Sequence, residues 1–235
     1  MEDWLVPFKT PFDVVGFVLF LLVFPVYHLL YPWLARVLPG RAARSRFDLF
    51  RESWIEGLIE RRDIIAAAQQ TRNLTMVNSI LVSSALILLG LTANVLVRAI
   101  PVTDSAPDLA DWFLHPSALR EKLYLLMIVF ALAFSFFMTS LRHLGHFVLV
   151  IGADPKLVEA HEGSPVKYFA ALINRASHRY TMGVRCLYSA VPLFGWLFDS
   201  RLFLVLTLFW AVKFVGFQDF ARLLRRGERR PRDAG

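Results

Sequence analysis

Long stretches without a charged residue dominate the hydrophobic pattern of this chain. The clearest one runs from Asn73 to Val97, where 25 consecutive residues carry no charge. At about 1.5 Å of rise per residue, a helix of this length crosses a hydrocarbon core of about 30 Å. The pattern therefore predicts a membrane-spanning helix in this segment.

Polar residues crowd the entrance of this helix. Gln69, Arg72 and Asn73 share one face at about 100° per residue. The same stripe continues through Met76, Ile80, Ser83, Ser84, Ile87 and Asn94. Because lipid cannot satisfy polar groups, we expect this face to point toward other helices, with this helix as the inner member of a small bundle.

The rest of the pattern predicts an all-α membrane protein with a single domain over residues 1–224 and a basic cytoplasmic tail over 225–235. Spans are expected at about 14–35, 74–97, 123–142, 180–198 and 202–221. Pro25 should bend the first span, since proline removes a backbone hydrogen bond. Pro192 and Gly195 weaken the fourth, so a re-entrant hairpin with fewer full crossings is the alternative.

Between the first two spans, residues 44–63 have the periodicity of an amphipathic helix. Its apolar stripe consists of Phe47, Phe50, Trp54, Ile55, Leu58 and Ile59. Such a helix can lie in the headgroup layer of a membrane, or dock its stripe on a partner protein. Further along, Gly152 to Pro155 and Gly163 to Pro165 are typical helix stop and start signals, which predict a long helix from Pro165.

Composition agrees with a membrane protein. The 235 residues are 56% hydrophobic, above the roughly 45–50% of a soluble domain, with a mean hydropathy of +0.50. Cys186 is the only cysteine, which excludes a disulfide within the chain. The net charge of +7 suggests nucleic acid in a soluble protein, but no basic face with interleaved aromatic residues stands apart from the apolar runs, so we expect no nucleic-acid partner.

The positive charge is better explained by membrane topology. Twenty Arg and Lys residues flank the predicted spans on one side and five on the other. The positive-inside rule then places the N-terminus outside and the C-terminus in the cytoplasm, in a bacterial inner membrane. The acidic start, Met1-Glu2-Asp3, and the lack of a small-residue cleavage site argue against a signal peptide.

Polar stripes on three helices are predicted to meet at the cytoplasmic end. The third span contributes Ser135, Thr139, Arg142 and His146, and the fourth helix Asn174, Arg175, His178, Met182, Arg185 and Ser189. The resulting candidate cluster is Gln69, Arg72, Asn73, Arg142, Arg185 and Tyr188. It could form a positive vestibule for an anion or a lipid headgroup, or its arginines could bond freed carbonyl groups at the helix ends.

Lys213 is a further candidate, because it lies about 17 Å along the last span and hence near the bilayer midplane. A charge buried there costs about 2.5–3.5 kcal/mol on insertion scales. Lys213 therefore requires a partner from another helix or subunit, a depressed pKa or a snorkelling path.

The sequence contains little that points to catalysis. His143 and His146 lie three residues apart and His178 could join them as a metal ligand, but no acidic or cysteine cluster accompanies them. Walker, dinucleotide-binding, H-E-x-x-H and G-x-S-x-G motifs are absent. We expect no enzymatic activity, no catalytic residue and no cofactor; a metal or haem protein is the least favoured alternative.

Several separated blocks of sequence resemble one family. The blocks comprise Ala67, Gln69, Arg72, Asn73, Ser140–Arg142, Ile151–Pro155, Gly183, Arg185, Tyr188, Pro192, Trp196, Asp219 and Phe220. Over roughly Pro11 to Leu224 the chain resembles the bacterial and plant membrane proteins called domain of unknown function 599. It departs from them at His143 and His146, where the family pattern favours amide residues. The resemblance implies a fold and a membrane location, but no activity.

Taken together, these features favour permeation or transport of a small anionic solute. Five spans enclose little room, so we expect a pore to form between subunits of a homo-oligomer. The alternative is a non-catalytic accessory subunit of a larger membrane complex, or a lipid-binding scaffold. Anionic membrane lipids are the expected partners in either case.

Overall fold

The structure, a computed structural model, describes residues 11–26, 43–99 and 118–214. All secondary structure in these ranges is helical, which confirms the predicted all-α class. The elements are α1 (Pro11–Leu21), the π-helical turn η1 (Leu22–Val26), α3 (Ala43–Arg61), α4 (Ile64–Ala99), α6 (Ala118–Val150), α7 (Pro155–Glu162), α8 (Pro165–Phe198) and α9 (Ser200–Val212).

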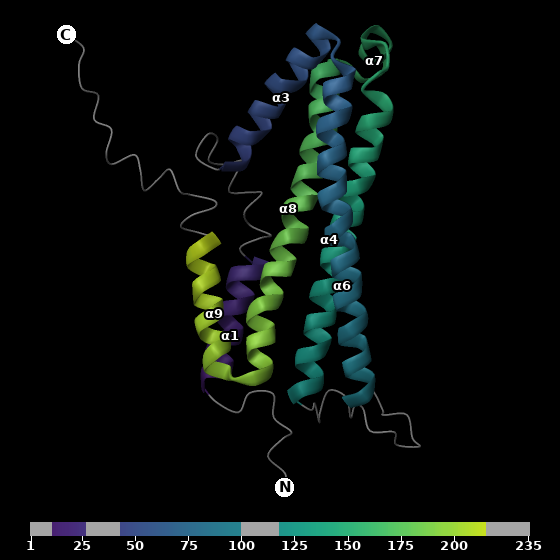
Figure 1. Ribbon diagram of the computed structural model, residues 1–235. Helices are drawn as coiled ribbons and strands as arrows, with labels where there is room; N and C mark the ends of the chain where they lie inside the picture. The colour runs from purple at the N-terminus through teal and green to yellow at the C-terminus, as the bar shows by residue number, and fades with distance from the viewer. Residues whose placement is uncertain (1–10, 27–42, 100–117, 215–235) are drawn as a thin grey trace, which may run out of the picture.

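Three long helices, α4, α6 and α8, lie side by side and set the length of the molecule (Figure 1). They contain 36, 33 and 34 residues, so each extends about 50 Å, well beyond a hydrocarbon core of about 30 Å. Within the described part of the chain, two helical stretches are long and apolar enough to cross a membrane, Ile64–Arg98 of α4 and Leu119–Val150 of α6.

The pairing of α6 with α8 forms the centre of the bundle. The Ser140 hydroxyl of α6 donates to the Ala176 carbonyl of α8 at 2.8 Å. One turn before Ser140 on α6, the buried ring of Phe137 covers Gly183 of α8. Even a Cβ atom at Gly183 would lie 2.7 Å from this ring. Glycine is therefore required for the close approach of these two helices.

The prediction that α4 is the inner helix, with its polar stripe turned inward, is wrong. Gln69, Arg72 and Asn73 are exposed, and so are Met76 and Ile80 along the same stripe. The buried face consists mainly of small or uncharged polar residues, namely Ala67, Thr71, Asn78, Ala85, Thr92 and Leu96. This face packs on α6, so α4 lies at the edge of the bundle, and α6 contacts both α4 and α8.

Small side chains explain this orientation, because they let two helix backbones approach closely. The serines outside the buried face need no neighbouring helix for their hydroxyl groups. Ser79, Ser83 and Ser84 each donate to the carbonyl four residues earlier, at 2.9 to 3.1 Å. Polar residues of this kind can therefore face away from the bundle.

Helix α3 follows the sequence prediction for 44–63 in extent. It ends at Arg61, and the next residue, Arg62, has a φ of 52° that turns the chain into α4. It leans over the N-terminal half of α8 (Figure 1). Ile55 and Leu58 of its apolar stripe are buried in a cluster with residues of α6 and α8, whereas Phe47 and Phe50 are exposed. Most of the stripe thus docks on the chain's own helices.

Beside the C-terminal half of α8, α1 and α9 pack against each other (Figure 1). Their core is aromatic and includes Phe20, Phe24, Trp196, Phe203 and Phe214. Pro25 lies in the π-helical turn η1, consistent with the predicted bend. The second half of the predicted first span, the end of the predicted last span, the Asp219–Phe220 block and the 225–235 tail fall outside the described residues.

Candidate functional site

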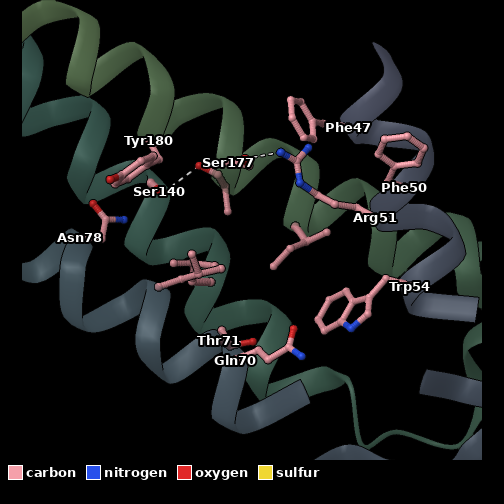
Figure 2. A pocket seen from close by; sticks show the side chains of 14 residues that line it. Phe47, Phe50, Arg51, Trp54, Gln70, Thr71, Asn78, Ser140, Ser177 and Tyr180 are labelled. Carbon is pink, nitrogen blue, oxygen red and sulfur yellow. Dashed lines mark hydrogen bonds between the residues drawn. The ribbon is translucent and has the colours of Figure 1, made fainter. Parts of the chain in front are cut away.

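A cavity of about 350 Å³ lies between α3 and the three long helices (Figure 2). We call it the α3 cavity. Its lining combines aromatic and aliphatic side chains with a small number of polar ones, which is typical of small-molecule sites. The lining residues are Phe47, Phe50, Arg51, Trp54, Gln70, Thr71, Leu74, Asn78, Ser140, Leu144, Ile173, Ala176, Ser177 and Tyr180.

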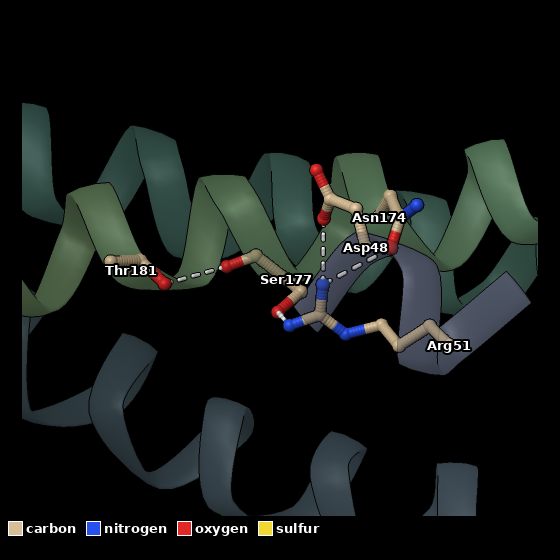
Figure 3. Close-up of polar contacts among 5 residues, drawn as sticks. All are labelled: Asp48, Arg51, Asn174, Ser177 and Thr181. Atoms are coloured by element: carbon tan, nitrogen blue, oxygen red, sulfur yellow. Dashed lines mark hydrogen bonds and ion pairs between the residues drawn. The ribbon is translucent and has the colours of Figure 1, made fainter. Parts of the chain in front are cut away.

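Arg51 fastens the α3 wall of this cavity to α8 (Figure 3). Its Nη1 donates to the Asp48 carboxylate at 2.9 Å and to the Asn174 side-chain oxygen at 3.0 Å, and its Nη2 donates to the Ser177 hydroxyl at 2.7 Å. Planar guanidinium groups suit such multiple bonds. Because Asp48 pairs with Arg51, this wall contributes a hydrogen-bonded pair of opposite charges rather than a lone cation.

The floor of the cavity holds hydroxyl groups that are already used. Thr71 donates to the Ala67 carbonyl at 2.7 Å, within α4. Ser140 donates to the Ala176 carbonyl, and Ser177 accepts from Arg51. The bonds of Ser140 and Ser177 join two helices each. Thr71 and Ser140, which both donate to a backbone carbonyl, keep only acceptor capacity toward the cavity.

Asn78 differs from Thr71 and Ser140, the other two buried polar residues of the lining. Its side chain is fully buried, yet neither Nδ2 nor Oδ1 has a hydrogen-bond partner within the described ranges. An unsatisfied buried amide costs about 1–3 kcal/mol, so such groups are rare in folded proteins. Figure 2 shows Asn78 at the same end of the cavity as Tyr180 and Ser140.

A second cluster with charged side chains lies further along α8, away from α3, where Arg185 and Lys213 contact aromatic rings. The Lys213 ammonium lies 4.3 Å from the ring centre of Trp210 and 5.2 Å from that of Tyr188, and these two rings stack at 4.4 Å. The Arg185 guanidinium lies 5.6 Å from the ring of Phe214. Cation–π contacts of this kind place the Lys213 ammonium between a ring of its own helix, Trp210, and a ring of α8, Tyr188.

A third polar centre, which sequence reasoning missed, joins α1 to the corner between α8 and α9. Asp13 is buried and its carboxylate accepts from the Trp196 indole nitrogen at 2.7 Å and from the Ser200 hydroxyl. Lys122 donates to the Trp196 carbonyl at 2.8 Å and lies over the Trp196 ring. An acid at the edge of an apolar run was the available signal, but its partners are far away in sequence.

The predicted cluster of Gln69, Arg72, Asn73, Arg142, Arg185 and Tyr188 does not converge on one point. The first four residues are exposed on α4 and α6, whereas Arg185 is buried. Ser140 of α6 is level with Ala176, and Arg185 follows nine residues later, about 14 Å deeper along α8. Arg185 and Tyr188 instead share the aromatic group with Lys213.

Histidine and arginine residues form a separate basic surface on α6 and α8. The charges of Arg142, Arg175 and Arg179 act on His143, with His146 one turn away. His178 lies half-buried on α8. Among the described residues no group of three His, Cys, Asp or Glu side chains could hold a metal ion, and the surrounding arginines make this surface unfavourable for a divalent cation.

A second cavity of about 350 Å³ lies beyond the α3 cavity, where the turn between α6 and α7 meets the start of α4. Ile151 to Pro155, one of the blocks that carry the family resemblance, form part of its lining. Asp154 caps α7 by accepting from the Lys156 backbone nitrogen at 3.0 Å. This block therefore has a structural role in starting α7.

Fold and site together define a class: an all-helical protein with two helices long and apolar enough to cross a membrane, and a cavity of mixed lining between these helices and an amphipathic one. The chain belongs to the family described as Protein of unknown function, DUF599, whose model matches residues 15–222. This match confirms the resemblance drawn from the separated sequence blocks. No curated protein and no solved structure matches the chain.

Proposed function

We propose that this chain is a multi-pass protein of a lipid bilayer and that it holds an amphipathic molecule of the inner leaflet in the α3 cavity. It would act as a lipid-binding scaffold or accessory subunit. The observation that carries the proposal is a cavity with both apolar and polar lining, located where the charge-free run of α4 begins.

The contacts between α6 and α8 support more than two crossings. Lys122 directly precedes the charge-free part of α6, and Ser140 lies near its end. Lys122 donates to the Trp196 carbonyl of α8, and Ser140 donates to the Ala176 carbonyl. The 20 residues of α8 between these contacts extend about 30 Å, the thickness of a hydrocarbon core. A bilayer that contains α6 must therefore contain this part of α8, together with α9, which packs against it, and α1, which packs against α9.

Charge asymmetry supplies the orientation of this arrangement. The α3 end of the bundle belongs to the side with twenty Arg and Lys residues, so it would face the cytoplasm of a bacterial inner membrane, with the N-terminus outside. Asn78 lies five residues, about 8 Å, inside the charge-free run that starts at Asn73. The cavity then straddles the boundary between headgroups and hydrocarbon, which suits a molecule with a polar head and an apolar chain.

Two tryptophan substitutions on α4 test this proposal. Leu74 lines the α3 cavity and Leu86 does not, and both side chains are 53% exposed. Leu74→Trp should narrow the cavity, whereas Leu86→Trp adds the same bulk elsewhere. Mass spectrometry of the purified full chain should find about one retained amphiphile per chain in the wild type and in Leu86→Trp, and less than about half of this in Leu74→Trp. Equal retention in all three proteins would reject the cavity as a lipid site.

Permeation of a small anion is the second candidate function. It is favoured by Arg185 and Lys213, because ionisable residues in the apolar part of a bundle often mark an ion path. Flux of a small anion into vesicles containing the protein, reduced in Lys213→Gln, would support it. If the wild-type protein retains lipid but gives no anion flux, permeation is excluded and the scaffold role is supported.

A further inference from the structure

We infer that Asn78 anchors the ligand of the α3 cavity, and that this ligand is a neutral single-chain amphiphile whose head carries a hydroxyl group. The inference rests on the proposed function, to which it adds the chemistry of the bound molecule. It follows from the hydrogen-bonding capacity that the cavity leaves unused, from its charge and from its volume.

The buried part of this unused capacity is at Asn78. Both polar atoms of its fully buried amide are without a hydrogen-bond partner among the described residues, although Ser140 and Tyr180 line the same end of the cavity (Figure 2). The amide offers two N–H donors and one oxygen acceptor. A ligand that satisfies both atoms must itself accept and donate, and a hydroxyl group does both.

Thr71 and Ser140, the other buried polar residues of the lining, cannot replace Asn78 as a donor. The hydroxyl protons of Thr71 and Ser140 are bound by backbone carbonyls at 2.7 and 2.8 Å. The Arg51 nitrogens are directed to Asp48, Asn174 and Ser177. Among the buried polar residues of the lining, the Asn78 amide is therefore the group that distinguishes a ligand with a hydroxyl head from a purely apolar one.

Charge favours a neutral head. Arg51 is the only ionisable Arg, Lys, Asp or Glu side chain that lines the cavity among the residues described, and it is paired with Asp48 at 2.9 Å. An anionic head would have to compete with Asp48 for Arg51 or give up its hydration without a countercharge, both of which are unfavourable.

Size and shape favour one chain. A volume of 350 Å³ equals that of about twelve water molecules at about 30 Å³ each, which accommodates a small head and the start of a chain. Phe47, Phe50 and Leu74 line the cavity and are also exposed, so they mark its open edge between α3 and α4. The remaining chain would leave by this edge into the surrounding lipid.

The test uses the purified full chain in detergent and three probes with one oleoyl chain: 1-oleoylglycerol, methyl oleate, which has no hydroxyl group, and an anionic oleoyl lysophospholipid. Binding is measured by native mass spectrometry and by the rise in unfolding temperature that a ligand of the folded state produces. We expect 1-oleoylglycerol to bind at least about tenfold more tightly than methyl oleate. The anionic probe should bind no more tightly than 1-oleoylglycerol.

Two variants of Asn78 locate the effect. Asn78→Leu removes the amide, and in Asn78→Thr the hydroxyl should bond the carbonyl four residues earlier, as Thr71 and Thr92 do. Both should weaken 1-oleoylglycerol binding about tenfold and leave methyl oleate unaffected. Asn94→Leu, an exposed change on the same helix, should have no effect. Without ligand, Asn78→Leu should unfold at the same temperature as the wild type or higher, which a purely structural role of the amide would not allow.

The possible failures are distinguishable. If 1-oleoylglycerol binds equally well to wild type, Asn78→Leu and Asn78→Thr, Asn78 is not the anchor and the inference is overturned. The same holds if the anionic probe binds best. In either case, weaker lipid retention in Leu74→Trp than in wild type would still support the proposed function. Equal retention in these two proteins would overturn both the proposed function and the role of Asn78.

Discussion

The carboxylate of Asp13 and the indole nitrogen of Trp196 are 183 residues apart in sequence and 2.7 Å apart in space. Ser200, at the start of α9, bonds the same carboxylate oxygen. Lys122 of α6 bonds the Trp196 carbonyl. One buried acid thus joins α1 to the α8–α9 corner, and the tryptophan extends the connection to α6, so this centre determines how the helices at this end assemble.

Removing the Trp196 donor should destabilise the protein. Trp196→Phe leaves the buried Asp13 carboxylate with one bond fewer, at an expected cost of about 1–3 kcal/mol in the free energy of unfolding. Trp210→Phe is a matched control, because Trp210 is also buried but its nitrogen has no hydrogen-bond partner among the described residues. Chemical unfolding in detergent should show the larger loss for Trp196→Phe; equal losses would mean that the bond to Asp13 contributes nothing.

Gly183 should tolerate no side chain. In Gly183→Ala the new Cβ would lie 2.7 Å from the ring of Phe137, which is fully buried and has no room to move. Overpacking of this kind costs about 1–3 kcal/mol. Gly90→Ala meets no atom within 4 Å and should instead stabilise α4 by about 0.5–1 kcal/mol. Unfolding temperatures that shift in the same direction in both variants would contradict the close α6–α8 approach.

Arg51 should control the attachment of α3. Arg51→Gln removes the bonds to Asn174 and Ser177, so amide hydrogens of α3 should exchange about tenfold faster, while those of α6 and α8 keep their rates. Arg61→Gln, an exposed change near the end of the same helix, is the control and should leave exchange unchanged. Unchanged exchange in α3 of Arg51→Gln would show that its apolar stripe alone holds the helix.

The sign of the charge at Lys213 should matter more than its presence. The faces of Trp210 and Tyr188 attract a cation and repel an anion. Lys213→Glu should therefore be less stable than Lys213→Met by about 1–2 kcal/mol. Thermal unfolding of the two variants compares them directly, and an equal or more stable Glu variant would exclude the cation–π arrangement.

Local signals predicted the helices of this protein well. Residue 165 begins α8 as expected from the Ser164-Pro165 signal, and Asp154 caps α7. Residues 44–63 were correctly predicted as a helix because their 3.6-residue periodicity is a property of the segment itself. Such features depend on neighbours within a few positions, which a sequence displays directly.

The buried face of α4 was missed because charge was given more weight than size. Thr71, Asn78, Ala85 and Thr92 recur every seven residues and are all buried, which is the spacing of a helix packed on a near-parallel neighbour. This signal was present in the sequence and would have singled out Asn78. The Asp13 centre was beyond prediction, since nothing near residue 13 indicates a partner at 196 or 200.

The proposed function requires that α4 crosses a bilayer with its α3 end in the cytoplasm. Ala68 and Val97 are exposed near the two ends of α4, 29 residues or about 44 Å apart. With Cys186 replaced by serine, single cysteines at these positions can be tested in intact bacteria with a membrane-impermeant maleimide. We predict labelling of Val97→Cys from outside, and of Ala68→Cys only after the membrane is opened. Labelling of both cysteines from the same side would contradict the account.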